Sequence, residues 1–284
     1  MSYTHNYGDL PEEYSNPEDS GTVIIPVAYD RTSTWIKGAD KGPEAIIEAS
    51  AHMELYDIET DSEIYKRGIF TEEPIKADKE PEEMTETVYD TVSRWLKKDK
   101  FTIVIGGEHS VSTGSIRALA EKYNDLSVLQ LDAHADLRDS YSGSKYNHAC
   151  VMARAKEHCP VVQAGIRSMD KSEKDSMDPS RVFFAEDIHN NTDWIQTAVS
   201  RLSQNVYITI DLDVFDPAVM PSTGTPEPGG LQWYDVLKLL RAVSDKREIA
   251  GFDVVELCPD SSNKSPDFLA AKLIYKLLSY KWKD

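Results

Sequence analysis

The chain has 284 residues, of which 40% are hydrophobic, so it is long enough to bury a substantial core in one α/β domain. Its net charge of −18, from 49 acidic and 31 basic residues, argues against nucleic acids and membranes as partners, because both attract a positive surface. Three cysteines without disulfide spacing, a polar N-terminus and the lack of an apolar run of about 20 residues predict a soluble, cytoplasmic protein.

Strands and helices are predicted to alternate along most of the chain. In chain order we expect a surface arm at 1–20, a strand at 22–29, a helix at 43–56, a charged surface excursion at 75–82, a helix at 82–98, a strand at 101–107, a helix at 112–123, a strand at 127–134, a helix at 149–157, strands at 161–167 and 181–186, a helix at 192–203, a strand at 206–216, a helix at 231–245, a strand at 249–257 and a helix at 266–281. Short apolar strands that alternate with helices indicate a parallel sheet covered on both faces, in a single domain over residues 1–284.

Polar residues gather where four of these strands end. The endings are "GGEHS" (106–110), "DAHAD" (132–136), "DLD" (211–213) and "VEL" (255–257). Parallel sheets bind ligands at the carboxyl ends of their strands, so these endings can meet although they are far apart in the sequence.

Candidate ligands in two of these endings recur at every second residue. Asp132, His134 and Asp136 can therefore project to one side of an extended chain, and so can Asp211 and Asp213. Several carboxylates in one crevice repel one another and are costly to desolvate, and divalent cations offset both effects. An oxygen-rich set with imidazoles suits a metal such as Mn²⁺ better than a thiolate-preferring one.

A sixth candidate ligand, His109, lies in "GGEHS". Taken alone, His109 is also typical of a satisfied core histidine, and an Asp-x-Asp pair after a strand is also a common turn or helix-cap device. The combination of all three groups at strand ends of one alternating chain favours a site for two metal ions, which would lie about 3.5–4 Å apart and share bridging carboxylates.

The motifs resemble those of the ureohydrolases, the family that includes arginase and agmatinase. The matching stretches are "GGEHS", "DAHAD", "NHACVM" (147–152), "DLDVFDP" (211–217), "GTPEPGG" (224–230) and "DVVELCP" (253–259), and "GPEAIIEAS" (42–50) looks particularly like agmatinases. The resemblance extends from about residue 22 to the end. It implies an arginase-like three-layer α/β/α fold with a mostly parallel eight-stranded sheet, two Mn²⁺ per subunit, and a homotrimer or homohexamer.

The family's metal ligands carry over residue by residue. One ion would be held by His109, Asp132, Asp136 and Asp211, and the other by Asp132, His134, Asp211 and Asp213, with Asp132 and Asp211 as the bridges. Glu108 stands where many members of the family have aspartate. Since this side chain is not a ligand in the family, no loss of metal is expected.

The resemblance also implies hydrolysis of a guanidinium group to urea and an amine, by a hydroxide that bridges the two ions. Asp136 would orient that hydroxide and pass on a proton, and Glu256 would bind the guanidinium N–H groups. The family counterpart of His148 shuttles a proton to the leaving amine, although His148 can instead cap the helix that follows it. Cys150 is interpreted as a small buried side chain rather than a nucleophile.

The loop 137–147 is short and departs from the arginase pattern, which favours a substrate without an α-carboxylate. Agmatine, cleaved to putrescine and urea, is therefore the expected small cationic substrate, with Asp170, Glu173 or Glu227 as candidate partners of its ammonium group. An exposed loop is the alternative interpretation of Asp170 and Glu173. The alternative substrates are N1-aminopropylagmatine, guanidinobutyrate, arginine and formiminoglutamate. The alternative function of a different class is that of a catalytically inactive, metal-binding member of the family.

Overall fold

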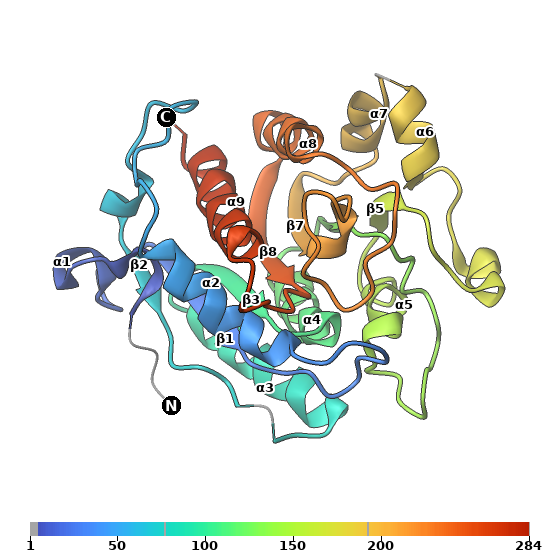
Figure 1. Cartoon of the computed structure of the whole chain (residues 1–284), viewed down its shortest axis with the longest axis horizontal. Helices are drawn as coiled ribbons and strands as arrows, with labels where there is room; N and C mark the ends of the chain where they lie inside the picture. The colour runs from blue at the N-terminus through green and yellow to red at the C-terminus, as the bar shows by residue number, and fades with distance from the viewer. Residues whose placement is uncertain (1–4, 77, 192, 284) are drawn as a thin grey trace.

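An eight-stranded sheet, parallel throughout, runs across the part of the chain that the computed structural model describes, residues 5–76, 78–191 and 193–283 (Figure 1). Its strands are β1 (Thr22–Val27), β2 (Ile69–Thr71), β3 (Phe101–Gly106), β4 (Leu126–Leu131), β5 (Val161–Ile166), β6 (Val182–Phe184), β7 (Asn205–Asp211) and β8 (Glu248–Val255). Their order across the sheet is β2-β1-β3-β8-β7-β4-β5-β6. The predicted α/β class and its mostly parallel eight-stranded sheet are confirmed.

Helices cover both faces of this sheet. They are α1 (Glu12–Ser15), α2 (Gly42–Ser50), α3 (Pro81–Leu96), α4 (Ser112–Lys122), α5 (Val151–Ala155), α6 (Ala185–Asn190), α7 (Trp194–Ser200), α8 (Trp233–Lys246) and α9 (Ser265–Lys281). Short 3-10 turns lie at η1 (Tyr7–Asp9), η2 (Ala39–Lys41), η3 (Ile64–Arg67), η4 (His109–Val111), η5 (His148–Cys150), η6 (Lys171–Ser176) and η7 (Leu212–Val214). None of the helices in the described ranges is long and apolar enough to cross a membrane.

Two hydrophobic cores lie on opposite faces of the sheet. One contains side chains of α2, α6, α7, α8 and α9, and the other contains side chains of α3, α4 and α5. The strands β1, β3 and β4 are buried at every residue, as expected for parallel strands covered on both sides. The helix α3 begins with Pro81 and carries Glu82 and Glu83 in its first turn, where proline and acidic residues are favoured.

Several local expectations differ from the structure. The strand β2 was not predicted, because three residues between loops give no readable periodicity. The stretch 181–186 was predicted as one strand, but it divides into β6 and the start of α6. The predicted surface excursion 75–82 overlaps the start of α3 at Pro81. Residue 77 of this excursion, residue 192 of the predicted helix 192–203 and residue 284 of the predicted domain lie outside the described residues.

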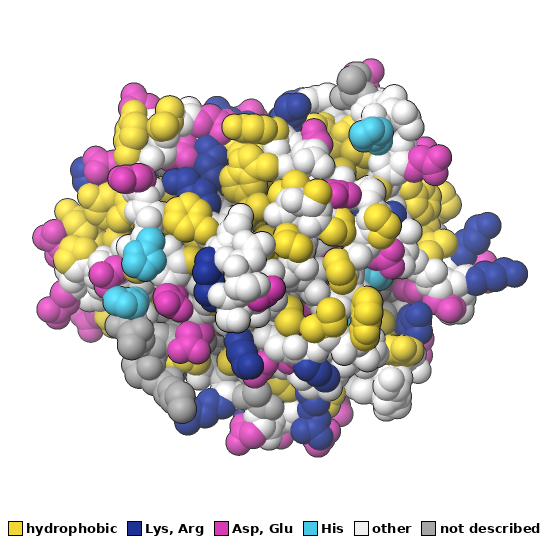
Figure 2. Space-filling view, in the orientation of Figure 1, with side chains coloured by type: hydrophobic (Ala, Val, Ile, Leu, Met, Phe, Trp, Pro, Cys, Tyr) yellow, Lys and Arg dark blue, Asp and Glu magenta, His cyan; other side chains and the backbone are white. Residues whose placement is uncertain are grey.

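The N-terminal segment, predicted as a surface arm over 1–20, is described from residue 5 onward. Tyr7 and Leu10 are buried there, and the Tyr7 hydroxyl donates a hydrogen bond of 2.7 Å to the main-chain oxygen of Ala271 in α9. This part of the segment is therefore anchored to the domain. Acidic side chains are scattered among hydrophobic and basic ones on the face in Figure 2, rather than gathered in one patch.

The chain order places a crossover at the centre of the sheet. After β3 the chain continues to β4, and β8 and β7 later fill the space between them. Ligands of open parallel sheets bind where the strand order reverses in this way. The four central strands, β3, β8, β7 and β4, are the strands whose endings carry the predicted site residues.

Candidate metal centre and active site

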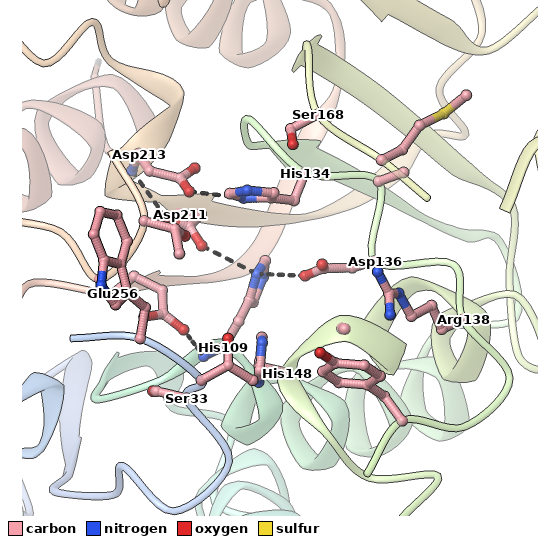
Figure 3. A pocket seen from close by; sticks show the side chains of 18 of the residues that line it. Ser33, His109, His134, Asp136, Arg138, His148, Ser168, Asp211, Asp213 and Glu256 are labelled. Carbon is pink, nitrogen blue, oxygen red and sulfur yellow. Dashed lines mark hydrogen bonds and ion pairs between the residues drawn. The ribbon is translucent and has the colours of Figure 1, made fainter. Parts of the chain in front are cut away.

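A cavity of about 290 Å³ opens at the carboxyl ends of these four strands (Figure 3). The loop after β3 supplies His109, and the loop after β4 supplies the "DAHAD" residues. The turn η7 supplies Asp213, and Glu256 directly follows β8. The close approach of the β3 loop to the β1 loop requires glycine, because a Cβ on Gly107 would lie 2.0 Å from the main-chain oxygen of Tyr29.

His109 faces three carboxylates. Its Nδ1 lies 3.1 Å from Asp132 Oδ2, 3.2 Å from Asp136 Oδ2 and 3.5 Å from Asp211 Oδ2. All four side chains are buried, and Nδ1 makes no hydrogen bond to any described residue. The imidazole and the carboxylates thus surround one point without satisfying one another.

The other ring nitrogen of His109 indicates which tautomer is present. His109 Nε2 lies 2.8 Å from Thr209 Oγ1, and the Thr209 hydroxyl donates to Asp253 Oδ1 at 2.6 Å. With its own proton used in this way, Thr209 accepts the Nε2–H of His109, so Nδ1 is the ring nitrogen left to bind a metal ion. Burial opposes the charged ring, but Asp132, Asp136 and Asp211 outweigh it and raise the pKa of His109 well above its ordinary value, so Nδ1 holds a proton that a metal ion would displace.

A second group of the same kind adjoins the first. His134 Nδ1 lies 2.9 Å from Asp213 Oδ2 and 3.6 Å from Asp132 Oδ1. Potential ligand atoms of His109, Asp132 and Asp211 lie within 4.8 Å of one another, and so do those of Asp132, His134 and Asp213. Asp132 belongs to both groups, which is the position expected of a bridging carboxylate.

The six predicted ligands therefore lie together, although their individual assignments stay predictions. Asp211 joins the first group, and its Oδ1 accepts a hydrogen bond of 2.8 Å from the main-chain N–H of Asp213. Gln130 donates to Asp132 Oδ2 at 2.7 Å and holds that carboxylate in place. Gln130 and Thr209 were not predicted, yet each is a polar residue within an apolar strand, which the sequence shows, and both are fully buried.

Burial and mutual repulsion change the pKa values of these groups. Burial, together with the charge of Asp132, raises the pKa of Asp136 to about 6, and burial beside Asp213 and Asp132 raises the pKa of Asp211 well above its ordinary value. Burial opposes the charged form of His134, but Asp213 and Asp132 outweigh it and raise the pKa of His134 to about 12. The metal-free centre therefore retains protons that a divalent ion must displace.

Mn²⁺ is expected to stabilise the fold more strongly as the pH rises from about 5.5 to about 8. Without metal, the folded state holds extra protons on Asp136 between its ordinary pKa of 3.8 and about 6, and on His134 above its ordinary 6.5. The free energy of unfolding of the metal-free protein should therefore fall as the pH rises through these ranges. Each displaced proton should strengthen the apparent metal affinity about tenfold per pH unit.

Melting temperatures of metal-stripped and Mn²⁺-loaded protein at several pH values test this expectation. A difference between the two melting temperatures that grows with pH is the expected result. A difference that stays constant, or that shrinks as the pH rises, would show that the ion does not displace these protons.

Glu256 and Asp136, both predicted to be catalytic, have unusual backbone conformations. Their φ angles are +67° and +52°, in the left-handed region that side chains other than glycine rarely adopt. Glu256 is held there by two hydrogen bonds of 2.7 Å, from its N–H to Gly107 O and from the His109 N–H to its Oε1. Such strain is commonly found at functional sites, where surrounding structure enforces it.

His148 lies at the start of η5 and lines the cavity. The capping of this turn is performed by its neighbour, because the Asn147 side chain accepts a hydrogen bond from the Ala149 N–H at 3.1 Å. The alternative that His148 caps the helix is therefore not needed. Burial raises the pKa of the Cys150 thiol to about 11, which fits its interpretation as a packed side chain.

Asp170 and Glu173 also line the cavity, but their carboxylates are engaged with main-chain atoms. Asp170 accepts from the Ser172 N–H at 2.9 Å, and the buried Glu173 accepts from the N–H groups of Asp170 at 2.7 Å and Leu137 at 2.8 Å. The pair forms a capping box at the start of η6. Their predicted contact with substrate stays a prediction, and Glu173 has little free acceptor capacity for it.

The loop after β1 contributes cavity residues that were not predicted. Ser33, Thr34, Trp35 and Ile36 line the cavity, and Trp35 is 71% exposed at its mouth. This loop follows the carboxyl end of β1, as the other site loops follow their strands, and this position in the chain could have indicated that it lines the site. Its residue types carry no metal-binding pattern, which is why sequence reasoning passed over it.

A parallel α/β sheet with two adjoining Asp and His groups at the carboxyl edge of its central strands is the architecture of the ureohydrolases. The model of the Arginase family matches residues 20–279, and the chain belongs to this family. It is thus a hydrolase that acts on C–N bonds of linear amidines.

Named relatives are similar over nearly the whole chain. A Synechocystis protein named N(1)-aminopropylagmatine ureohydrolase is 38% identical over 95% of this chain and 92% of its own length. A Pyrococcus horikoshii agmatinase is 32% identical over 98% of both chains. The solved agmatine ureohydrolase of Thermoplasma volcanium has a TM-score of 0.86 and 34% identity, and the match covers 95% of this chain and 93% of that one.

Proposed function

We propose that this protein uses two Mn²⁺ ions to hydrolyse the guanidinium group of agmatine, or of an agmatine extended at its amine, to urea and the free amine. The observation that carries the proposal is the orientation of His109, whose Nδ1 faces three buried carboxylates beside the cavity that contains Glu256. Oxygen-rich ligands with two imidazoles suit manganese.

The chain's own residues divide the chemistry among them. Bound Mn²⁺ would lower the pKa of a shared water and so supply hydroxide at neutral pH. Asp136, whose Oδ2 lies 3.2 Å from His109 Nδ1, orients the attacking group. Glu256 Oε1 accepts the His109 N–H, while its Oε2 accepts no hydrogen bond from a described residue and can receive guanidinium N–H groups. His148, which lines the same cavity (Figure 3), passes a proton to the leaving amine.

The cavity rim favours a substrate with an amine rather than a carboxylate. Arg138 is engaged by Glu173, with its Nε 3.7 Å from that carboxylate, and its guanidinium lies 4.3 Å from the ring centre of Tyr141. Glu227 Oε1 lies 3.9 Å from His134 Nε2 at the partly exposed rim, where it can attract a distal ammonium group. Apolar surface on Trp35 and Met169 suits a methylene chain.

N1-aminopropylagmatine is the second candidate substrate. It has the same guanidinobutyl end as agmatine and one additional amine on a propyl arm. The 38% identity to the Synechocystis relative, above the 32% to the Pyrococcus horikoshii agmatinase, favours it. With agmatine the amine product is putrescine, and in both cases the protein would act in polyamine synthesis.

Product release by Mn²⁺-loaded protein should be compared, as urea for agmatine, N1-aminopropylagmatine, guanidinobutyrate and arginine, and as formamide for formiminoglutamate. We expect kcat/KM for the first two to exceed that for the carboxylate-bearing compounds by at least about 100-fold, which corresponds to about 2.7 kcal/mol. Metal-stripped protein is the control and should release no urea until Mn²⁺ is restored. Preference for guanidinobutyrate, arginine or formiminoglutamate would contradict the proposed substrate class.

A further inference from the structure

Glu108, the residue that departs from the family's usual aspartate, is fully buried and reaches the loop after β1. Its Oε2 accepts hydrogen bonds from both the N–H and the hydroxyl of Thr32, each at 2.7 Å. Its Oε1 accepts a hydrogen bond of 2.5 Å from the Ser110 hydroxyl. The carboxylate is thus fixed at both oxygens, and one of them holds Thr32 in a defined orientation.

Thr32 in turn contacts His148 twice. The main-chain N–H of His148 donates to Thr32 Oγ1 at 3.0 Å, and the ring Nδ1 of His148 lies 3.0 Å from the same oxygen. Thr32 and His148 are 116 positions apart in the sequence, yet they form one continuous chain of contacts with Glu108. None of these three residues belongs to the metal groups.

Counting protons along this chain fixes the tautomer of His148. The Thr32 hydroxyl has one proton, and it is donated to Glu108. Its oxygen therefore serves as the acceptor for both N–H groups of His148, so in the neutral ring the proton lies on Nδ1. The lone pair of His148 is then on Nε2, the nitrogen available to the reaction.

We infer that Thr32 and Glu108 are positioning residues that hold the His148 imidazole with Nδ1 protonated and Nε2 free toward the cavity. This inference rests on the proposed function, in which His148 transfers a proton to the leaving amine. An imidazole with the opposite tautomer would present an N–H to the cavity and could not first accept a proton there. Thr32 and Glu108 act through His148 and touch neither the substrate nor a reacting atom.

The support of Thr32 depends on the length of the side chain at position 108, where this chain has glutamate and many members of the family have aspartate. Aspartate is shorter than glutamate by one methylene group, about 1.5 Å. A carboxylate withdrawn by that distance could not keep contacts of 2.7 Å with both the N–H and the hydroxyl of Thr32. Glu108→Asp therefore removes the support of Thr32 while it keeps the charge.

The test compares Thr32→Val, which removes the hydroxyl at nearly constant shape, with Thr32→Ser, which keeps it. We expect Thr32→Val and Glu108→Asp to lower kcat by about 10- to 100-fold with KM within about twofold, and Thr32→Ser to restore most of kcat. In a His148→Asn background, Thr32→Val should have no further effect on kcat. Thr197→Val, an exposed position in α7, is the matched control and should leave kcat unchanged.

A second readout does not depend on turnover. Two-bond ¹H–¹⁵N NMR correlations of the imidazoles, recorded with diamagnetic Mg²⁺ in place of Mn²⁺, report which nitrogen of His148 carries the proton, and His148→Asn assigns its signal. We expect Nδ1–H in the unmodified protein and in Thr32→Ser, and a mixture of tautomers in Thr32→Val and Glu108→Asp.

An Nε2–H tautomer in the unmodified protein, or a tautomer that Thr32→Val and Glu108→Asp leave unchanged, would overturn the inference. So would an equal loss of kcat from Thr32→Val with and without His148. If the unmodified protein hydrolyses none of the five candidate substrates, the proposed function fails, and the NMR result still decides whether Thr32 and Glu108 set the tautomer.

Discussion

Asp211→Asn is expected to abolish Mn²⁺-dependent urea release while the protein remains folded. Asp211 is buried in the first ligand group and belongs to the family's proposed bridging pair, so the change removes a negative charge that two ions would share. Loss of one charged partner from a buried ionic cluster costs about 3–5 kcal/mol, which corresponds to a fall of about 10²- to 10⁴-fold in metal affinity. Burial raises the pKa of Asp211, so the neutral amide should not weaken the metal-free fold.

Metal content and activity should be measured together for this variant. Bound manganese per chain can be determined after dialysis, and urea release can be followed over a range of Mn²⁺ concentrations. Asp99→Asn is the matched control, because Asp99 is 91% exposed and lies just before β3, at the end of that strand away from the cavity. Full activity of Asp211→Asn would contradict the two-metal assignment.

Glu256→Gln should retain metal and fold but lose about 10²- to 10³-fold in kcat/KM, because the partly buried charge that receives the guanidinium cation is removed. Glutamine keeps an oxygen that can accept the 2.7 Å hydrogen bond from the His109 N–H, so the loop that carries His109 should stay in place. Burial and the nearby Glu108 raise the pKa of Glu256 well above its usual range, and a bound cation would favour its ionised form.

Steady-state kinetics with agmatine and N1-aminopropylagmatine, together with manganese content, test this expectation. The control is Glu248→Gln at the other end of the same strand, where the side chain is 58% exposed and pairs with Lys281. Loss of manganese from Glu256→Gln would instead assign Glu256 to the support of the metal centre. Unchanged kcat/KM would exclude it from guanidinium binding.

The fold and the ligand groups were predictable because their signals are local. Strands such as β3 and β4 are short apolar runs that end in polar clusters, and the two-residue spacing of Asp132, His134 and Asp136 is visible within five positions. The parallel arrangement then brings the endings together, because all strands end at the same edge. The strand β2 was not predictable in this way, because it is too short for its apolar pattern to stand out from the loops around it.

The contacts that orient the site were not predictable, because they join segments that are distant in the sequence. Thr32 gives no sign of its relation to His148, which depends on how the loops after β1 and β4 meet. The capping role of Asp170 and Glu173 is a different case, because an acidic residue followed three positions later by glutamate is a local pattern for a turn start. That pattern can be read from the sequence, and it favours a structural role for Asp170 and Glu173 over contact with substrate.

The chain of contacts behind His109 ties metal binding to correct strand pairing. Thr209 in β7 and Asp253 in β8 are register partners, and their 2.6 Å hydrogen bond aligns the hydroxyl that receives the His109 N–H. A shift of one residue between these strands would turn one side chain to the opposite face and leave the imidazole unsupported. Metal uptake would therefore depend on correct pairing of the central strands, because a mispaired chain would lack a correctly aimed ligand and the stability that a bound ion would confer.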